Sequence, residues 1–131
     1  MLDRIDLHVE VTPVDFSELS SSRKGETSAH IRDRVINARQ IQTERFNGQH
    51  CIYCNAQMNS RLLHEVCAIN QAGHHLLKIA MQKLNLSARA YDRILKVSRT
   101  IADLAGKKEI LAEHLAEAIQ YRSLDRENWA G

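Results

Sequence analysis

The chain has 131 residues, of which 44% are hydrophobic and 26% are charged, as in an ordinary globular domain. Its formal net charge of +2 gives no whole-molecule reason to expect nucleic-acid binding, and no apolar run approaches the roughly 20 residues needed to cross a membrane. The start, MLDRIDLHVEV, lacks the basic and apolar regions of a signal peptide, so we expect a cytoplasmic protein without a membrane partner.

The N-terminal residues carry a strand-like pattern. Apolar and polar side chains alternate through residues 4–11, from Ile5 to Val11, with the period of a β-strand that buries one face. A single strand cannot pair its own backbone groups. We therefore expect residues 1–12 to be the terminal strand of a core domain that the chain lacks, as in a fragment of a larger protein.

Residues 13–27 read as a flexible linker, because they hold Pro13, three consecutive serines and Gly25. From residue 28 the apolar spacing becomes helical. We expect residues 28–125 to form a helical bundle and residues 126–131 a frayed tail. The predicted fold class is mainly α: about five helices preceded by one isolated strand and a linker.

Five helices are expected in chain order. They run from Ser28 through Ile41, from Asn59 or Ser60 through Val66, over about residues 71–84, from Ser87 through Leu104, and over about residues 112–122. The fourth has the clearest pattern, with apolar residues at steps of four and three: Ala90, Ile94, Val97, Ile101 and Leu104. This stripe predicts one core-facing side, and Gly106 suits a left-handed C-terminal cap.

Basic residues of the fourth helix also recur at one spacing. Arg93, Lys96 and Arg99 are three residues apart, which places them near one another on the helix surface. The ordinary interpretation is the solvated side of an amphipathic helix. The alternative is a face that touches DNA or a neighbouring subunit.

ATP hydrolysis by a P-loop enzyme needs the loop G-x-x-x-x-G-K-[ST], whose backbone amides hold the phosphates. The chain has five glycines and no such loop. It is therefore not expected to hydrolyse ATP alone.

The sequence Leu2-Asp3-Arg4-Ile5-Asp6-Leu7 resembles the Leu-x-Arg-Phe-Asp-Leu turn that ends the ATPase core in the helix-2-insert branch of AAA+ proteins. Magnesium chelatases and minichromosome-maintenance helicases belong to that branch. The resemblance implies that Arg4 is an arginine finger, which neutralises charge on the phosphoryl group bound by the adjacent subunit. Without it, Arg4 would be a surface arginine in an ion pair.

Residues 86–104 resemble the lid-helix signature of magnesium-chelatase-like AAA+ proteins, and residues 114–122 continue the match. In that signature the arginine of Ser-Ala-Arg is the sensor 2 residue. The resemblance implies that Arg89 is this nucleotide-binding residue, near the positive end of the helix dipole and directed at the phosphates. The alternative is an ordinary first-turn surface arginine.

Further residues resemble the linker and early lid of the competence-type subgroup of this family, which includes a ring-forming helicase that promotes DNA branch migration. They are residues 25–28, Arg45-Phe46, residues 55–58 and Cys67. The resemblance implies a lid module of an intact protein that uses ATP and Mg²⁺, while the fragment itself is expected to hold no cofactor. The implied partners are an upstream AAA+ core of the same polypeptide, neighbouring subunits of a homo-oligomeric ring, and DNA. The runner-up function is the ATPase subunit of a magnesium chelatase.

The cysteines leave a third alternative open. Cys51 and Cys54 form a Cys-x-x-Cys, and with His64 and Cys67 they would supply the ligands of a Cys3His zinc site. Such a site would make the chain a zinc-stabilised interaction domain. A redox pair is another interpretation, and reduced cysteines without a special role are the ordinary one. We expect no metal site.

Overall fold

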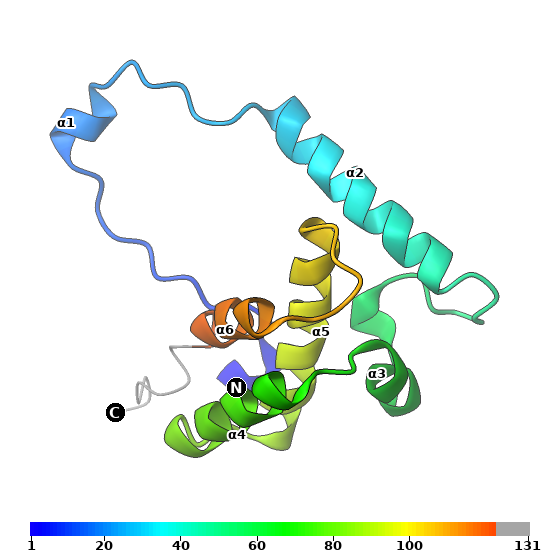
Figure 1. Cartoon of the computed structure of the whole chain (residues 1–131). Helices are drawn as coiled ribbons and strands as arrows, with labels where there is room; N and C mark the ends of the chain where they lie inside the picture. The colour runs from blue at the N-terminus through cyan, green and yellow to red at the C-terminus, as the bar shows by residue number, and fades with distance from the viewer. Residues whose placement is uncertain (123–131) are drawn as a thin grey trace.

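A computed structural model describes residues 1–122 and shows a mainly helical protein (Figure 1). Its elements are η1 (Leu2–Arg4), α1 (Phe16–Leu19), α2 (Ser28–Arg45), η2 (Asn55–Gln57), α3 (Ser60–Val66), α4 (Gln71–Lys83), α5 (Ala88–Leu104) and α6 (Ala112–Gln120). The predicted α-helical fold is confirmed. The expected tail, residues 126–131, and residues 123–125 of the expected lid lie outside the described residues.

Most of the longer helices begin at polar caps, because the first backbone amides of a helix lack partners within it. Thr27 caps α2, Asn59 caps α3 and Ser87 caps α5, each through a side-chain oxygen that accepts from a backbone amide of the first turn. Of the two residues considered as the cap of α3, Asn59 is the one that caps it. The cap of α2 is Thr27, one residue before the expected Ser28. Gly106 has φ +67°, as a left-handed residue after α5 requires.

Helix α5 organises the bundle, since α2, α3 and α6 all contact it and α4 packs on α6. Figure 1 shows α2 leaving this cluster along its N-terminal half. The apolar core gathers side chains from α3, α4, α5 and α6 and from the segments between helices, among them Phe46, Leu63, Leu77, Ile94, Ile110 and Leu115. Each large side chain buried in this way contributes about 1.5–3 kcal/mol to folding.

The predicted terminal strand has no partner among the described residues, and its place in a core that the chain lacks stays a prediction. Arg4 ends the short helix η1, and residues 5–11 form no ladder with any described residue. Leu7, Val9 and Val11 are 48%, 65% and 85% exposed. The alternation is present without a partner strand, and an unpaired strand has nothing to hold its backbone groups.

Residues 9–27 are exposed throughout. They pass away from the bundle, carry the single turn α1 and return at α2 (Figure 1). In the chain this segment connects the N-terminal eight residues to α2, and its role as a linker between domains stays a prediction.

The predicted apolar stripe of α5 is only half correct. Ala90 and Ile94 are buried, but Val97 and Ile101 are half-buried and Leu104 is 49% exposed. The face that turns inward at the C-terminal end carries Ser98, Arg99, Ala102 and Asp103, all at most 3% exposed. The placement of Arg99 on a solvated basic face is therefore wrong.

Candidate functional site

Arg89 lies at the start of α5, where the helix dipole is positive. Ser87 fixes that start, because its hydroxyl accepts from the amide of Ala90 at 3.2 Å. The Arg89 side chain is 64% exposed, and its Nη1 lies 3.7 Å from Oδ2 of Asp3. A guanidinium held this loosely at a helix N-terminus can exchange its carboxylate partner for another anion.

Arg4 is exposed at the end of η1, which packs against α5. Asp3, the neighbour of Arg4 in the sequence, is also the carboxylate that pairs with Arg89, which lies 85 positions beyond Arg4. Burial acts to raise the pKa of Asp3, but the chain's terminal ammonium group, Arg89 and Arg4 outweigh it. The pKa of this carboxyl therefore lies below its ordinary value.

The N-terminal segment is anchored to the bundle by polar contacts. Arg122, which is 1% exposed, donates to the carbonyl oxygens of Ile5 and Leu2. The backbone amide of His8 donates to the carbonyl of Tyr121 at 2.8 Å, and its Nε2 lies 3.0 Å from the carbonyl oxygen of Leu2. These contacts fix the position of η1, and therefore of Arg4, relative to α5.

A second ion pair joins the same two elements. Arg93, one turn beyond Arg89, pairs with Asp6. The side chains are 32% and 53% exposed, so the pair orients the segment more than it stabilises it. Arg93 therefore faces the N-terminal segment. The sequence offered no spacing rule for this partner.

A different group of arginines lies inside the bundle. Arg45, at the end of α2, donates to both carboxylate oxygens of Asp103 on α5, at 2.8 and 2.6 Å. It also donates to Oδ1 of Asn55 at 2.9 Å, and Nδ2 of Asn55 donates to Asp103 at 2.9 Å. The Asp103 side chain is fully buried. This closed set of charge-assisted bonds ties α2 and η2 to α5.

Arg99 completes that buried network. Its two terminal nitrogens donate to the carbonyls of Lys107 and Lys108 at 2.7 and 2.8 Å, and its Nε lies 3.3 Å from Oδ1 of Asp103. Burial lowers the pKa of the Arg99 guanidinium, and the charge of Asp103 opposes that shift. Arg45 and Asn55, which belong to the stretches singled out by family resemblance, are thus built into the lid's own scaffold.

The structure does not gather the four zinc candidates, which lie within the described residues, into one cluster. Cys51 and His64 are exposed, Cys54 is half-buried with Sγ 3.6 Å from Oε1 of Gln57, and Cys67 is buried in the core. No group of three or more His, Cys, Asp or Glu residues within residues 1–122 is arranged to hold a metal ion. Burial raises the pKa of the Cys67 thiol from 9.0 to about 11, which keeps it protonated.

No helix in the described part of the chain is both long enough and apolar enough to span a bilayer.

The sequence matches one protein family and several known proteins over most of its length. Residues 25–122 match the family described as magnesium chelatase, subunit ChlI C-terminal. The chain is similar to competence protein ComM of Haemophilus influenzae, with 45% identity over 126 residues, and to uncharacterized protein YifB of Salmonella typhimurium, with 37% over 126 residues. It is 31% identical over 122 residues to uncharacterized protein Mb2921c of Mycobacterium bovis. These alignments cover 93–95% of the chain and 24% of each relative, so it spans about a quarter of their length.

Proposed function

The chain belongs to the magnesium chelatase subunit ChlI C-terminal family, and from that premise we propose that it is the C-terminal lid module of a magnesium-chelatase-like AAA+ ATPase. In this proposal the ATP-binding core lies upstream in the same polypeptide and binds ATP with Mg²⁺. The lid contributes arginines to hydrolysis, and the intact subunits assemble into a homo-oligomeric ring.

The observation that carries the proposal is the position of Arg4 and Arg89. They come from two separate motifs, yet both lie at the surface beside Asp3 where η1 meets the start of α5. Arg89 is the sensor 2 residue of this proposal and contacts the nucleotide phosphates. Arg4 is the arginine finger and acts on the nucleotide of the adjacent subunit.

Asp3 fits this arrangement as a temporary partner. Its carboxylate holds Arg89 at 3.7 Å, a distance that gives a weak, exposed pair. A triphosphate carries more negative charge and presents oxygens that a guanidinium binds bidentately. Binding of nucleotide therefore replaces Asp3 at Arg89, and lid movement after hydrolysis restores it.

The chain alone is not expected to bind nucleotide with useful affinity. One arginine adds about 1–3 kcal/mol through charge-assisted contacts, while even a millimolar dissociation constant requires about 4 kcal/mol. Tests of the proposed activity therefore need the intact polypeptide.

We propose DNA as the substrate on which the motor acts, in the manner of a branch-migration helicase. The support is the likeness to a competence protein, at 45% identity, together with the resemblance of residues 55–58 to the competence-type subgroup. The family description itself favours a second candidate, the ATPase subunit of a magnesium chelatase. A zinc-stabilised interaction domain has no comparable support, since the residues described here offer no metal-binding group.

ATP turnover of the intact polypeptide separates the two candidates. We expect branched DNA to raise the turnover rate severalfold above that of the protein alone, with a smaller effect of single strands. Stimulation by a porphyrin and chelatase partner subunits, with no response to any DNA, would replace the first candidate by the second. Absence of ATP turnover under all these conditions would contradict both.

A further inference from the structure

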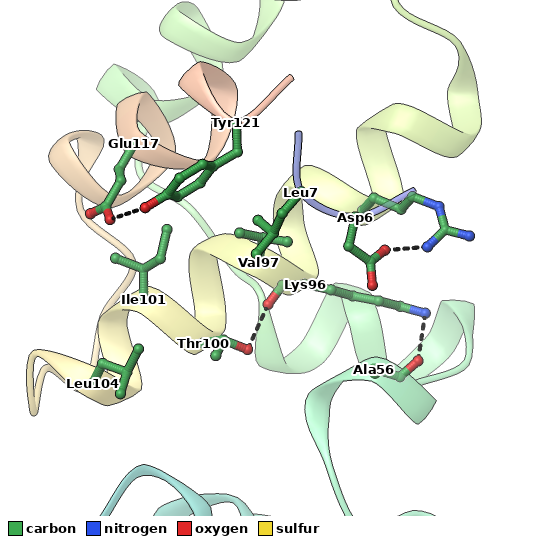
Figure 2. A pocket seen from close by; sticks show the side chains of 11 residues that line it. Asp6, Leu7, Ala56, Lys96, Val97, Thr100, Ile101, Leu104, Glu117 and Tyr121 are labelled. Atoms are coloured by element: carbon green, nitrogen blue, oxygen red, sulfur yellow. Dashed lines mark hydrogen bonds and ion pairs between the residues drawn. The ribbon is translucent and has the colours of Figure 1, made fainter. Parts of the chain in front are cut away.

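Two adjoining hollows lie along the outer side of α5. The first, of about 340 Å³, is bounded by the N-terminal segment, α5 and α6, and is shown in Figure 2. The second, of about 620 Å³, lies between α2, η2 and α5. They share Ala56, Thr100 and Leu104, so they form one continuous depression, here called the α5 groove.

The floor of the α5 groove is apolar. It is made by the part of the α5 stripe that the core leaves uncovered: Val97, Ile101 and Leu104. Figure 2 shows Leu7 and Tyr121 beside this stripe. The opposite wall, on α2, carries Val35, which is 43% exposed. An uncovered apolar surface of this kind marks a site for a protein partner.

Some of the charged residues around the α5 groove have an oppositely charged partner and others have none within the described part of the chain. Asp6 is paired with Arg93, and Glu117 accepts the hydroxyl of Tyr121 at 3.2 Å. Arg39 and Lys96 have no carboxylate partner within residues 1–122, and Nζ of Lys96 donates only to the carbonyl of Ala56. The Tyr121 hydroxyl is neutral and leaves the Glu117 carboxylate charged. Asp6 and Glu117 therefore offset two of the three lining cations, Arg93, Lys96 and Arg39, and the groove keeps a net excess of one positive charge.

The complementary surface lies on residues 9–19, here called the acidic segment. It contains three acidic residues, Glu10, Asp15 and Glu18, and no basic residue. Its apolar side chains are strongly exposed, with Phe16 at 83% and Leu19 at 70%. These two are three positions apart on the turn α1, so they point to one side of it. An exposed phenylalanine and leucine flanked by carboxylates suit an apolar groove with positive edges.

We propose that the acidic segment of one copy of this chain docks in the α5 groove of a second copy. Within one copy, His8 is anchored to Tyr121, and the segment then runs away from the bundle with α1 standing clear of α5 (Figure 1). A neighbouring copy can bind it in this position. Because segment and groove are different surfaces, the contact is head-to-tail, and its repetition forms a ring where the rotation closes and an open filament where it does not. It does not depend on the ATPase role of the chain.

Photo-crosslinking tests the contact directly. Phe16 is replaced by p-benzoylphenylalanine in the whole chain, and equal amounts of ¹⁵N-labelled and unlabelled protein are mixed and irradiated. The expected result is crosslinks between a labelled and an unlabelled chain at residues 93–104 or Tyr121. Crosslinks confined to one chain, crosslinks to other surfaces between chains, or no crosslink would each overturn the proposal.

A matched pair of variants supplies the specificity control. Leu104→Asp places a carboxylate on the floor of the groove and is expected to lower the crosslink yield about tenfold, the factor that corresponds to about 1.4 kcal/mol. Ile36→Asp changes an equally exposed residue, at 54% against 49%, that does not line the groove, and it should leave the yield unchanged. Circular dichroism of both variants checks that the helices are retained. An unchanged yield in folded Leu104→Asp would contradict the proposal.

Discussion

Two regions of this molecule are built around arginine, and they use it in opposite ways. Around Asp103, the side chains of Arg45 and Arg99 are 18% and 4% exposed and bind carboxylate and carbonyl oxygens from three parts of the chain. At the start of α5, the Arg89 side chain is 64% exposed and has one carboxylate at 3.7 Å.

The difference shows that the number of unused hydrogen-bond donors distinguishes an arginine that holds the bundle together from one that can bind a ligand. A buried guanidinium must have its donors satisfied, because an unpaired buried charge costs several kcal/mol. Arg45 and Arg99 therefore have little capacity left for a phosphate. Arg89 keeps most of its donors in solvent, where a nucleotide can reach them.

The largest difference between the two regions is expected when the carboxylate shared by the buried arginines, that of Asp103, is removed. Asp103→Ala leaves Arg45 and Arg99 without their counter-charge inside the bundle, and we expect a loss of about 3–5 kcal/mol in the free energy of unfolding. Urea denaturation followed by circular dichroism measures it. Asp6→Ala, which breaks the exposed pair with Arg93, is the control and should cost less than about 1 kcal/mol. Equal losses in the two variants would contradict the distinction.

The pH dependence of stability probes the buried region without disrupting its ion pairs. Cys67 lies in the core, and burial, the largest cause, raises the pKa of its thiol from 9.0 to about 11. Because the folded thiol keeps its proton to higher pH than the unfolded one, its stabilising contribution is complete below pH 9. It is lost as the pH rises through about 11, and the whole change is about 3 kcal/mol.

Comparison with Cys67→Ala isolates this effect from other groups that titrate in the same range. The variant is less stable at neutral pH because it leaves a small cavity, but its free energy of unfolding should fall less steeply between pH 9 and 11. The thiols of Cys51 and Cys54, which are more exposed, should react with a thiol reagent at pH 8 well before Cys67. Parallel curves of unfolding free energy against pH for wild type and variant would show that burial does not raise the pKa of the Cys67 thiol.

The smallest effect on stability is expected from substitution of Arg89. Arg89→Ala removes an exposed side chain with one long ion pair, so the free energy of unfolding should change by less than about 0.5 kcal/mol. Chemical denaturation measures this change. A loss comparable to that of Asp103→Ala would place Arg89 in the scaffold.

The fold was predictable from the sequence where local chemistry decides it. Asn59 and Ser87 fix helix starts through their own side chains, and Gly106 ends α5 in the conformation that glycine favours. The strand expected at residues 4–11 stays a prediction, because alternation is a local pattern and its partner strands were expected in a core that this chain lacks.

The buried network was not predictable because its members are far apart in sequence. Arg45 and Asp103 are separated by 58 positions, and nothing near either residue indicates the other. Arg99 is buried on α5 and pairs with the same Asp103. Arg4 and Arg89 came from family resemblance, and the structure adds the ion pair between Arg89 and Asp3, the neighbour of Arg4 in the sequence. Their roles in hydrolysis stay predictions.

The central claim is that Arg4 and Arg89 act on nucleotide, and ATP turnover of the intact polypeptide tests it most directly. Arg61→Ala removes an arginine whose side chain is 85% exposed on α3 and serves as the control with normal turnover. We predict that Arg4→Ala and Arg89→Ala each lower turnover by about 100-fold or more, and that Arg4→Ala keeps most of its ATP binding. Normal turnover in both variants would contradict the account and return both residues to the ordinary protein surface.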